Sequence, residues 1–148
     1  MRKSFRGLLA DGDQERIRLS TNNGLTGYKV IKFQLIAKLP GAQSQESVCK
    51  IFTNDPTNVD ATIDFTDPTL LGVAYYRDNN NEIYPTSSDI IFDHAVINQD
   101  IFITHVDVAI GQQVNYYIEL EQVKLSENEA AVATLKDMRA GPDTNFGP

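Results

Sequence analysis

Apolar and polar residues alternate along most of this chain, a pattern typical of strands that bury one face. The longest run covers residues 28–39, whose predicted buried face carries Ile31, Phe33, Leu35, Ala37 and Leu39. Further candidate strands cover residues 16–20, 47–53, 61–66, 70–76, 89–93, 101–108 and 114–125. Clusters of Asn, Asp, Pro and Gly separate these runs, as turns require. About eight strands at this spacing predict a mostly-β fold, a single-domain antiparallel β-sandwich or jelly roll.

Residues 101–125 contain two long alternating runs joined by a short turn around Gly111. This arrangement predicts an antiparallel hairpin. In its second strand Tyr116, Ile118 and Leu120 share one face, while Glu119 and Glu121 share the other. One face of the hairpin is therefore expected to be buried, and the other to meet water or a partner.

One short helix is expected after the last strand, over residues 127–139 or thereabouts. Ser126 and Glu129 have the spacing of a capping box, and Gly141 followed by Pro142 suits a helix stop. Residues 1–15 lack sustained periodicity and are predicted to be an N-terminal arm. The predicted organisation is thus an arm (1–15), a β-sandwich domain with its helix (16–139) and a flexible C-terminal tail (140–148).

The chain has 148 residues and a formal net charge of −7, which disfavours nucleic acid or an anionic membrane as its main partner. The charge is uneven along the sequence. Residues 1–45 carry eight Lys or Arg against three acids (+5), residues 46–100 two against ten (−8), and residues 101–148 three against seven (−4). The basic arm of one copy could therefore lie on the acidic face of a neighbour, the alternative being a solvated surface.

Cys49 is the only cysteine, so the chain can form neither an internal disulfide nor a thiolate-rich metal site. No apolar run approaches the roughly 20 residues needed to span a bilayer. The basic amino terminus is followed by too short an apolar stretch for a signal peptide. We expect synthesis and folding in a bacterial cytoplasm.

Candidate catalytic or metal-binding groups are sparse. His105 is in phase with the apolar positions of its strand and is expected to be an inward, hydrogen-bonded histidine, and His94 is expected to make a strand-end hydrogen bond. Acids gather in two stretches, but neither matches the ordered positions of a calcium loop, and turn chemistry explains them: Asp55, Asp60, Asp64 and Asp67, then Asp78 and Glu82. No nucleophile elbow, phosphate loop or dinucleotide motif is present. We therefore expect no catalytic residue, no metal site and no cofactor.

Two tyrosine pairs, Tyr75-Tyr76 and Tyr116-Tyr117, lie within predicted strands. Neighbouring residues of a strand point to opposite faces. One tyrosine of each pair is therefore expected in the core, and the other at a surface that a partner can reach.

Several segments carry a resemblance to small virion structural proteins of marine tailed bacteriophages. They are residues 5–12, 16–21, 27–34, 98–105, 115–122 and 132–136, so that the similarity spans nearly the whole chain. The resemblance implies a place in a virion, and it brings no catalytic residues with it. Because the excess negative charge disfavours a lumen packed with DNA, we expect the chain on the outer surface of the particle.

The leading hypothesis is a non-enzymatic protein that decorates or cements the outer face of a phage capsid, with the major capsid protein or other virion proteins as partners. Its termini would contact neighbours, and the candidate contacts are Arg2, Lys3, Phe5, Arg6, Arg16 and Arg18. A homo-oligomer is expected, with a trimer favoured and a dimer or monomer left open. The alternatives are a tail, collar or fibre-attachment protein, a glycan-binding module using Asn80 and Tyr84, and, last, an enzyme dependent on His105.

Overall fold

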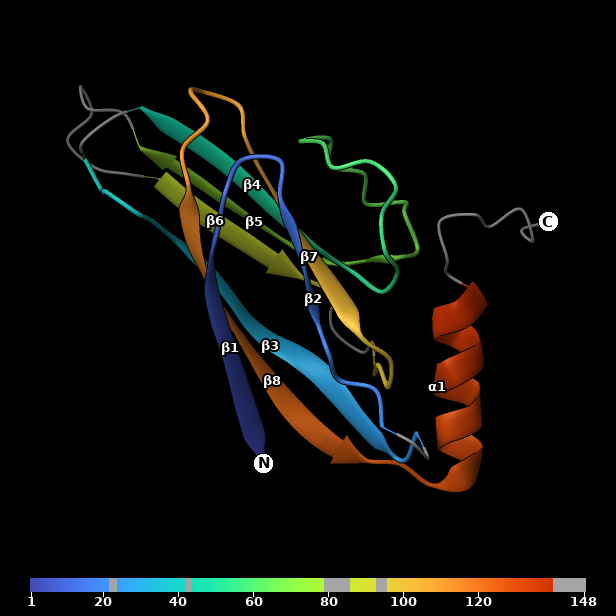
Figure 1. Cartoon of the computed structure of the whole chain (residues 1–148). Helices are drawn as coiled ribbons and strands as arrows, with labels where there is room; N and C mark the ends of the chain where they lie inside the picture. The colour runs from blue at the N-terminus through green and yellow to red at the C-terminus, as the bar shows by residue number, and fades with distance from the viewer. Residues whose placement is uncertain (22–23, 42–43, 79–85, 93–95, 140–148) are drawn as a thin grey trace.

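The computed structural model describes residues 1–21, 24–41, 44–78, 86–92 and 96–139. These residues form eight strands in two antiparallel sheets and one C-terminal helix, which confirms the expected mostly-β fold (Figure 1). The three-stranded sheet has the order β1-β8-β3, and the five-stranded sheet has the order β2-β7-β4-β5-β6. The elements are β1 (Arg2–Leu9), β2 (Gln14–Ile17), β3 (Thr26–Ala37), β4 (Gln45–Phe52), β5 (Leu70–Asp78), β6 (Thr86–Ile91), β7 (Ile101–Asp107), β8 (Val114–Lys124) and α1 (Glu127–Arg139).

The main core lies between the two sheets and is built from the inward-facing residues of alternating strands. Ile118 and Leu120 of β8 and Ile101 and Ile103 of β7 have no exposed surface. They belong to one cluster that also contains Phe33 of β3. The central strand of the small sheet and a central strand of the large sheet therefore supply the middle of the core. Burial of these apolar side chains is the main force that holds the two sheets together.

The predicted hairpin of residues 101–125 is wrong, although both of its strands exist. β7 pairs with β2 and β4, whereas β8 pairs with β1 and β3, so the connection of residues 108–113 crosses from one sheet to the other. The Asp107 carboxylate holds this crossing, because it accepts hydrogen bonds from the backbone N–H groups of Glu46, Ala109 and Gln112. β7 and β8 each have an apolar face. Because the two strands lie on opposite sides of the core, both apolar faces are buried.

Strand β3 changes its buried phase at a bulge. Val30 is opposite Leu120 and Lys32 is opposite Glu119, which leaves Ile31 as an extra residue. An extra residue reverses which positions face inward. Tyr28 is buried before the bulge, whereas Phe33, Leu35 and Ala37 are buried after it. The predicted buried face therefore holds only from Phe33 to Ala37; Ile31 is half-buried, and Leu39, beyond the strand, is 62% exposed.

Residues 1–15 do not form the predicted arm. Arg2–Leu9 is a strand that pairs with β8 over its whole length, and the second strand begins at Gln14. The strand lacks strong alternation because Gly7 occupies an inward position and Lys3 lies at the sheet edge. Tyr116 compensates for the missing side chain, since a Cβ built on Gly7 would lie 2.7 Å from the Tyr116 ring. An aromatic side chain that covers a strand glycine in this way supports pairing.

The expected strand at residues 61–66 is also absent. This segment belongs to a long connection between β4 and β5, covering residues 53–69, in which Ile63 and Phe65 are exposed. Its alternation matches a strand, but its backbone is turned by Asp side chains that bond to residues two positions ahead. Local turn chemistry prevails here over the period-2 pattern.

The predicted C-terminal helix is confirmed, together with its cap. Ser126 Oγ accepts from Glu129 N (3.2 Å), and Glu129 Oε1 accepts from Ser126 N (3.1 Å), the two reciprocal bonds of a capping box. The buried Asn98 amide also donates to Ala130 O and Thr134 Oγ1 and so attaches α1 to the sandwich. The tail predicted at residues 140–148 lies outside the described residues.

Candidate functional site on the basic side of the sandwich

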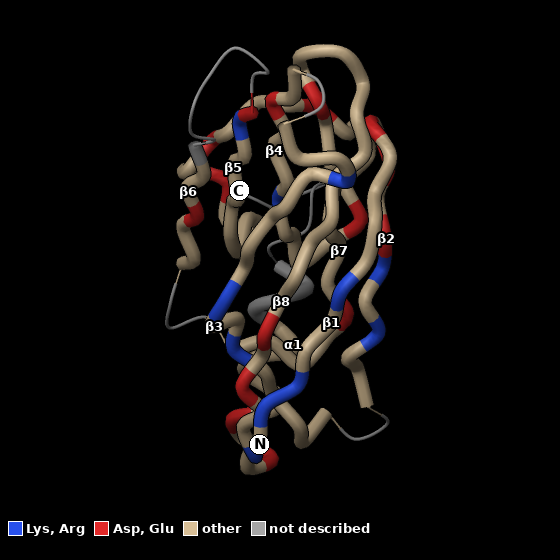
Figure 2. The backbone as a smooth tube through the Cα atoms, turned by 90° about the vertical axis from the view of Figure 1, so that its left-hand side faces the viewer, with Lys and Arg blue, Asp and Glu red and all other residues tan. Residues whose placement is uncertain are grey.

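The predicted contact residues gather along one side of the sandwich, because β1 and β2 are the terminal strands of their sheets on that side. Figure 2 shows the Lys and Arg positions of these two strands running along the same side. The Tyr116 hydroxyl donates to Glu15 Oε1 (2.8 Å) and so links the two sheets there. We call Arg2, Lys3, Arg6 and Arg18 the basic edge.

β1 carries its charges on both faces. Arg2, Ser4, Arg6 and Leu8 lie on the outer face of the sheet, and all four are exposed. On the inner face, Lys3 extends to the Tyr28 hydroxyl (3.4 Å), with its Nζ 5.6 Å from the centre of the Tyr28 ring. This contact places the Lys3 charge at the rim of the sandwich, where the chain of methylenes covers an aromatic surface while the ammonium stays hydrated.

Phe5, a predicted contact, has a different role. It is partly buried on the inner face of β1 and packs against the main core. The same alternation that exposes Arg6 turns Phe5 inward. Phe5 therefore stabilises the strand that presents the basic edge, and it contributes little surface to a partner.

Arg16, another predicted contact, is held by Asp100. Its Nε and Nη2 donate to Asp100 Oδ2 at 2.7 and 2.6 Å, and its guanidinium carbon lies 5.8 Å from the Phe102 ring centre. Asp100 Oδ1 accepts the backbone N–H groups of Leu19 (2.7 Å) and Ser20 (2.9 Å). Asp100 and Arg16 therefore shape the segment that follows β2, and the exposed Arg18 is the cation left for a partner.

The hydrogen bonds at Asp100 change its acidity. Burial alone would raise the pKa of this carboxyl, but the backbone N–H groups of Ser20 and Leu19 and the Arg16 guanidinium stabilise the ionised form more strongly. The pKa falls to about 2. Asp100 therefore stays negative at any neutral or mildly acidic pH, and the segment beside Arg18 stays attached.

Arg2 is only partly neutralised. Its Nη1 lies 3.0 Å from Glu119 Oε1, while 69% of its side chain remains exposed. An ion pair this exposed contributes little to stability, and its arginine can exchange the partner at small cost. Next to it, a hollow of about 650 Å3 opens on the outer face of the small sheet, lined by Arg6, Gly7, Leu8, Gln34, Ile36, Asn115, Tyr116 and Tyr117. The basic edge thus borders a surface with accessible apolar groups.

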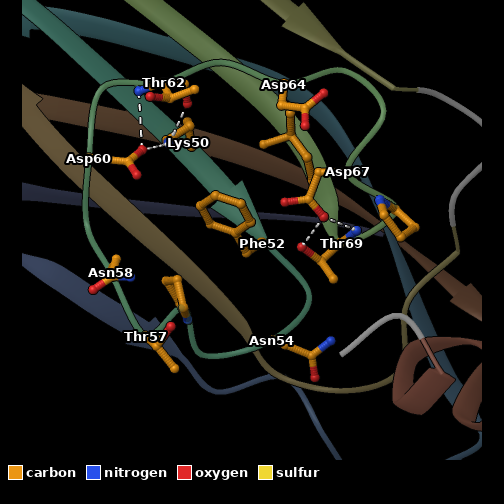
Figure 3. A pocket seen from close by; sticks show the side chains of 13 residues that line it. Lys50, Phe52, Asn54, Thr57, Asn58, Asp60, Thr62, Asp64, Asp67 and Thr69 are labelled. Atoms are coloured by element: carbon orange, nitrogen blue, oxygen red, sulfur yellow. Dashed lines mark hydrogen bonds and ion pairs between the residues drawn. The ribbon is translucent and has the colours of Figure 1, made fainter. Parts of the chain in front are cut away.

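A second cavity, of about 310 Å3, lies beneath the connection of residues 53–69 (Figure 3). Lys50, buried on β4, donates to Asp60 Oδ1 (3.0 Å) and Thr62 O (2.6 Å), and its Nζ is 5.4 Å from the Phe52 ring centre. The hydrogen bond from Lys50 lowers the pKa of Asp60. Lys50 therefore attaches this connection to the outer face of the large sheet.

Asp55, Asp64 and Asp67 of this connection each have their own hydrogen-bond partner. Asp64 accepts from Thr66 and Asp67 accepts from Thr69, as in the turns expected from the sequence, while Asp55 accepts from Gln14. Within the described residues, no group of three or more His, Cys, Asp or Glu side chains is arranged to hold a metal ion. The arrangement explains these carboxylates as turn and anchor groups.

His105 is the inward, hydrogen-bonded histidine that its phase predicts. Its Nδ1 lies 3.1 Å from both Leu9 O and Ala10 O, and its Nε2 lies 2.9 Å from Ser47 Oγ. Burial lowers the pKa of His105, which favours a neutral ring with its proton on Nδ1. Ser47 and His105 resemble a nucleophile and base in their distance, but neither has exposed surface, so a substrate has no access to them. His94 lies outside the described residues.

One tyrosine of each pair lies in the core, as predicted, and the partner surface expected for the other stays a prediction. Tyr76 and Tyr116 are buried in the main core, whereas Tyr75 and Tyr117 are only partly buried. Asn80 and Tyr84, named for glycan binding, and Glu82 lie outside the described residues. Asp78 binds Gly41 N and the Tyr76 hydroxyl.

Comparison of the chain with protein-family models, with curated proteins and with solved structures finds no match. No helix in the described part of the chain has the length and apolar character needed to cross a membrane.

Proposed function

We propose that this chain is a non-enzymatic virion structural protein that docks on the outer face of a phage capsid through its basic edge. The observation that carries the proposal is the position of Arg2, Arg6 and Arg18, three exposed cations on one side of a chain whose net charge is −7. A cationic side on an acidic protein is attracted to an acidic surface, and this attraction orients the protein on it. The same side repels the cationic side of a second copy. The resemblance of the sequence to small phage virion proteins supports the same role.

This docking surface is rigid, unlike a pair of flexible termini that wrap around a neighbour. Because residues 2–9 form a strand of the small sheet, the cations of β1 are held at fixed spacing on a rigid element. A preorganised surface loses less conformational entropy on binding than a disordered arm does. The proposed contact is therefore a rigid edge that matches a complementary acidic surface, and a homo-oligomer on the shell, with a trimer favoured, belongs to the same proposal.

Copy number tests the location. We expect quantitative mass spectrometry of purified particles to find the chain at a simple ratio to the major capsid protein. A handful of copies per particle would instead support the alternative role in a tail, collar or fibre attachment. Absence of the chain from particles would overturn both roles.

Charge reversal tests the site. We expect the double variant Arg2→Glu/Arg6→Glu to lower particle occupancy at least tenfold, because attraction to an acidic surface becomes repulsion. The matched control is Lys29→Glu/Lys32→Glu, which makes the same charge change on β3, at the opposite border of the same sheet. Equal occupancy of the two variants would contradict docking through the basic edge, and urea unfolding of both would verify that each is folded.

A further inference from the structure

The outer edge of β1 has the geometry of a strand that can accept another strand. β1 has eight residues, and its pairing with β8 runs from Arg2 to Leu9 without a shift of register. The other terminal strands are less suitable: β2 has four residues, β6 has six, and β3 is interrupted by the bulge at Ile31. A long, regular terminal strand presents a row of backbone donors and acceptors to any chain that approaches it.

The hydrogen-bond pattern identifies which backbone groups face outward. Gln122 N donates to Met1 O (2.8 Å), which makes Met1 and Gln122 a bonded pair of the antiparallel ladder. Bonded and non-bonded pairs alternate along such a ladder. The N–H and C=O groups of Arg2, Ser4, Arg6 and Leu8 therefore point away from β8, toward the outer edge.

Side-chain charge decides what kind of strand fits. A second copy of β1 added antiparallel would gather four arginines on one face, Arg2 and Arg6 of each copy. With Ser4 opposite Ser4, Arg2 of each copy would lie directly opposite Arg6 of the other. Like charges directly opposite each other destabilise a strand pair. The inner-face Lys3 adds a third cation along the same edge. Pairing of β1 with itself is thus disfavoured, whereas a strand with carboxylates at alternate positions would meet Arg2 and Arg6 on the outer face.

We infer that the edge of β1 binds an extended, acidic segment of a partner protein by β-strand addition. Backbone hydrogen bonds to Arg2, Ser4, Arg6 and Leu8 supply affinity that does not depend on the sequence of the segment. Ion pairs to Arg2 and Arg6 select segments with acids at alternate positions. The inference rests on the proposed function in taking the basic edge as the docking site, and it adds the chemistry of the partner.

The test uses the full chain, labelled with 15N, and a short synthetic peptide with Glu at alternate positions between β-branched residues. We expect the peptide to shift the amide signals of β1 and to slow hydrogen exchange at Ser4 and Arg6. A peptide with Lys in place of each Glu is the charge control and should leave these signals unmoved. Absence of any shift with the acidic peptide at millimolar concentration would overturn the inference.

Two variants separate strand addition from charge attraction alone. Ser4→Pro removes an outward N–H without removing a bond to β8, and proline is tolerated at such edge positions. We expect it to weaken the acidic peptide about tenfold, while Ser4→Ala changes binding little. Arg2→Glu/Arg6→Glu should abolish binding of the acidic peptide. Equal binding to Ser4→Pro and to the unmodified chain would show a purely ionic contact and overturn strand addition.

The outcomes for the two proposals are distinct. If charge reversal lowers particle occupancy but the peptide leaves β1 unchanged, docking stands and strand addition fails. If the peptide binds β1 but the chain is absent from particles, strand addition stands and the virion role fails.

Discussion

At the scale of single residues, Asp100 decides which arginine of the basic side is available to a partner. It binds Arg16 and the amides of Leu19 and Ser20, and it leaves Arg18 exposed. Arg16 and Arg18 are equivalent in the sequence, since both alternate with the buried Ile17 and Leu19. The difference between them arises from a carboxylate more than eighty positions away in the chain.

Asp100 also makes a prediction about acid stability. Its folded pKa of about 2 lies below its ordinary value of 3.8, so its stabilising effect is fully present above pH 3.8 and is lost as the pH falls toward 2. The loss amounts to about 2 kcal/mol. We expect urea unfolding between pH 2 and 5 to show this dependence, and Asp100→Asn to flatten it. The exposed control Glu121→Gln should retain it; an unchanged slope in Asp100→Asn would contradict the role of this carboxylate.

His105 predicts a second pH dependence, at higher pH. Burial lowers its pKa below the ordinary value of 6.5, so the unfolded chain binds a proton more readily than the folded chain does. Stability should therefore be fully present above pH 6.5 and decline as the pH falls below it. We expect His105→Gln to lower stability at neutral pH and to weaken this decline. If His105→Gln lost as much stability below pH 6.5 as the unmodified chain, another titrating group would be the cause.

At the scale of elements, alternation predicted most strands correctly but said little about their partners. β7 and β8 satisfy every local requirement of a hairpin, yet they occupy different sheets. Residues 61–66 satisfy the same period and form no strand, because the side chains of Asp60, Asp64 and Asp67 bond to the local backbone. The capping box at Ser126 and Glu129 was predictable because both of its partners lie within one helical turn.

The connection of residues 53–69 offers a prediction at this scale. Lys50→Met keeps the apolar part of the side chain but removes the bonds to Asp60 and Thr62, and we expect it to cost about 1 kcal/mol. Because Asp60 is exposed to solvent, no buried charge is left unpaired. Hydrogen exchange should become faster in the described residues 60–66 while β8 remains protected. Lys32→Met, on the exposed face of β3, is the control; equal exchange in the two variants would contradict the anchoring role.

At the scale of the whole molecule, folding decides on which surfaces the charged residues of the sequence lie. Five of the eight cations of the first third lie on β1, on β2 or just after β2, and the other three lie on β3 or just after it. The acids of residues 53–69 lie over the outer face of the large sheet. The basic side also presents the outer edges of two terminal strands, β1 and β2. A docking surface that combines the two features can bind through backbone and charge together.

This arrangement predicts salt dependence. Re-association of the purified chain with particles stripped of it should weaken as salt rises from low to high ionic strength, because exposed charge pairs are screened over about 10 Å at 0.1 M. Because charge reversal turns the attraction into repulsion, the residual binding of Arg2→Glu/Arg6→Glu should strengthen as salt rises. Binding that is insensitive to salt in the unmodified chain would assign docking to the apolar hollow beside β1 and not to the arginines.

The sequence by itself determined those features whose causes act over a few residues. These are the positions of most strands, the helix with its cap, the inward His105 and one buried tyrosine in each pair, since period-2 burial and capping depend on near neighbours. Tertiary structure alone decided that β1 is a strand, that β7 and β8 separate into two sheets, that Ile31 is bulged and that Asp100 holds Arg16. Each of these depends on contacts between residues distant in the chain, and the energy of such contacts exists only once the two sheets have packed together.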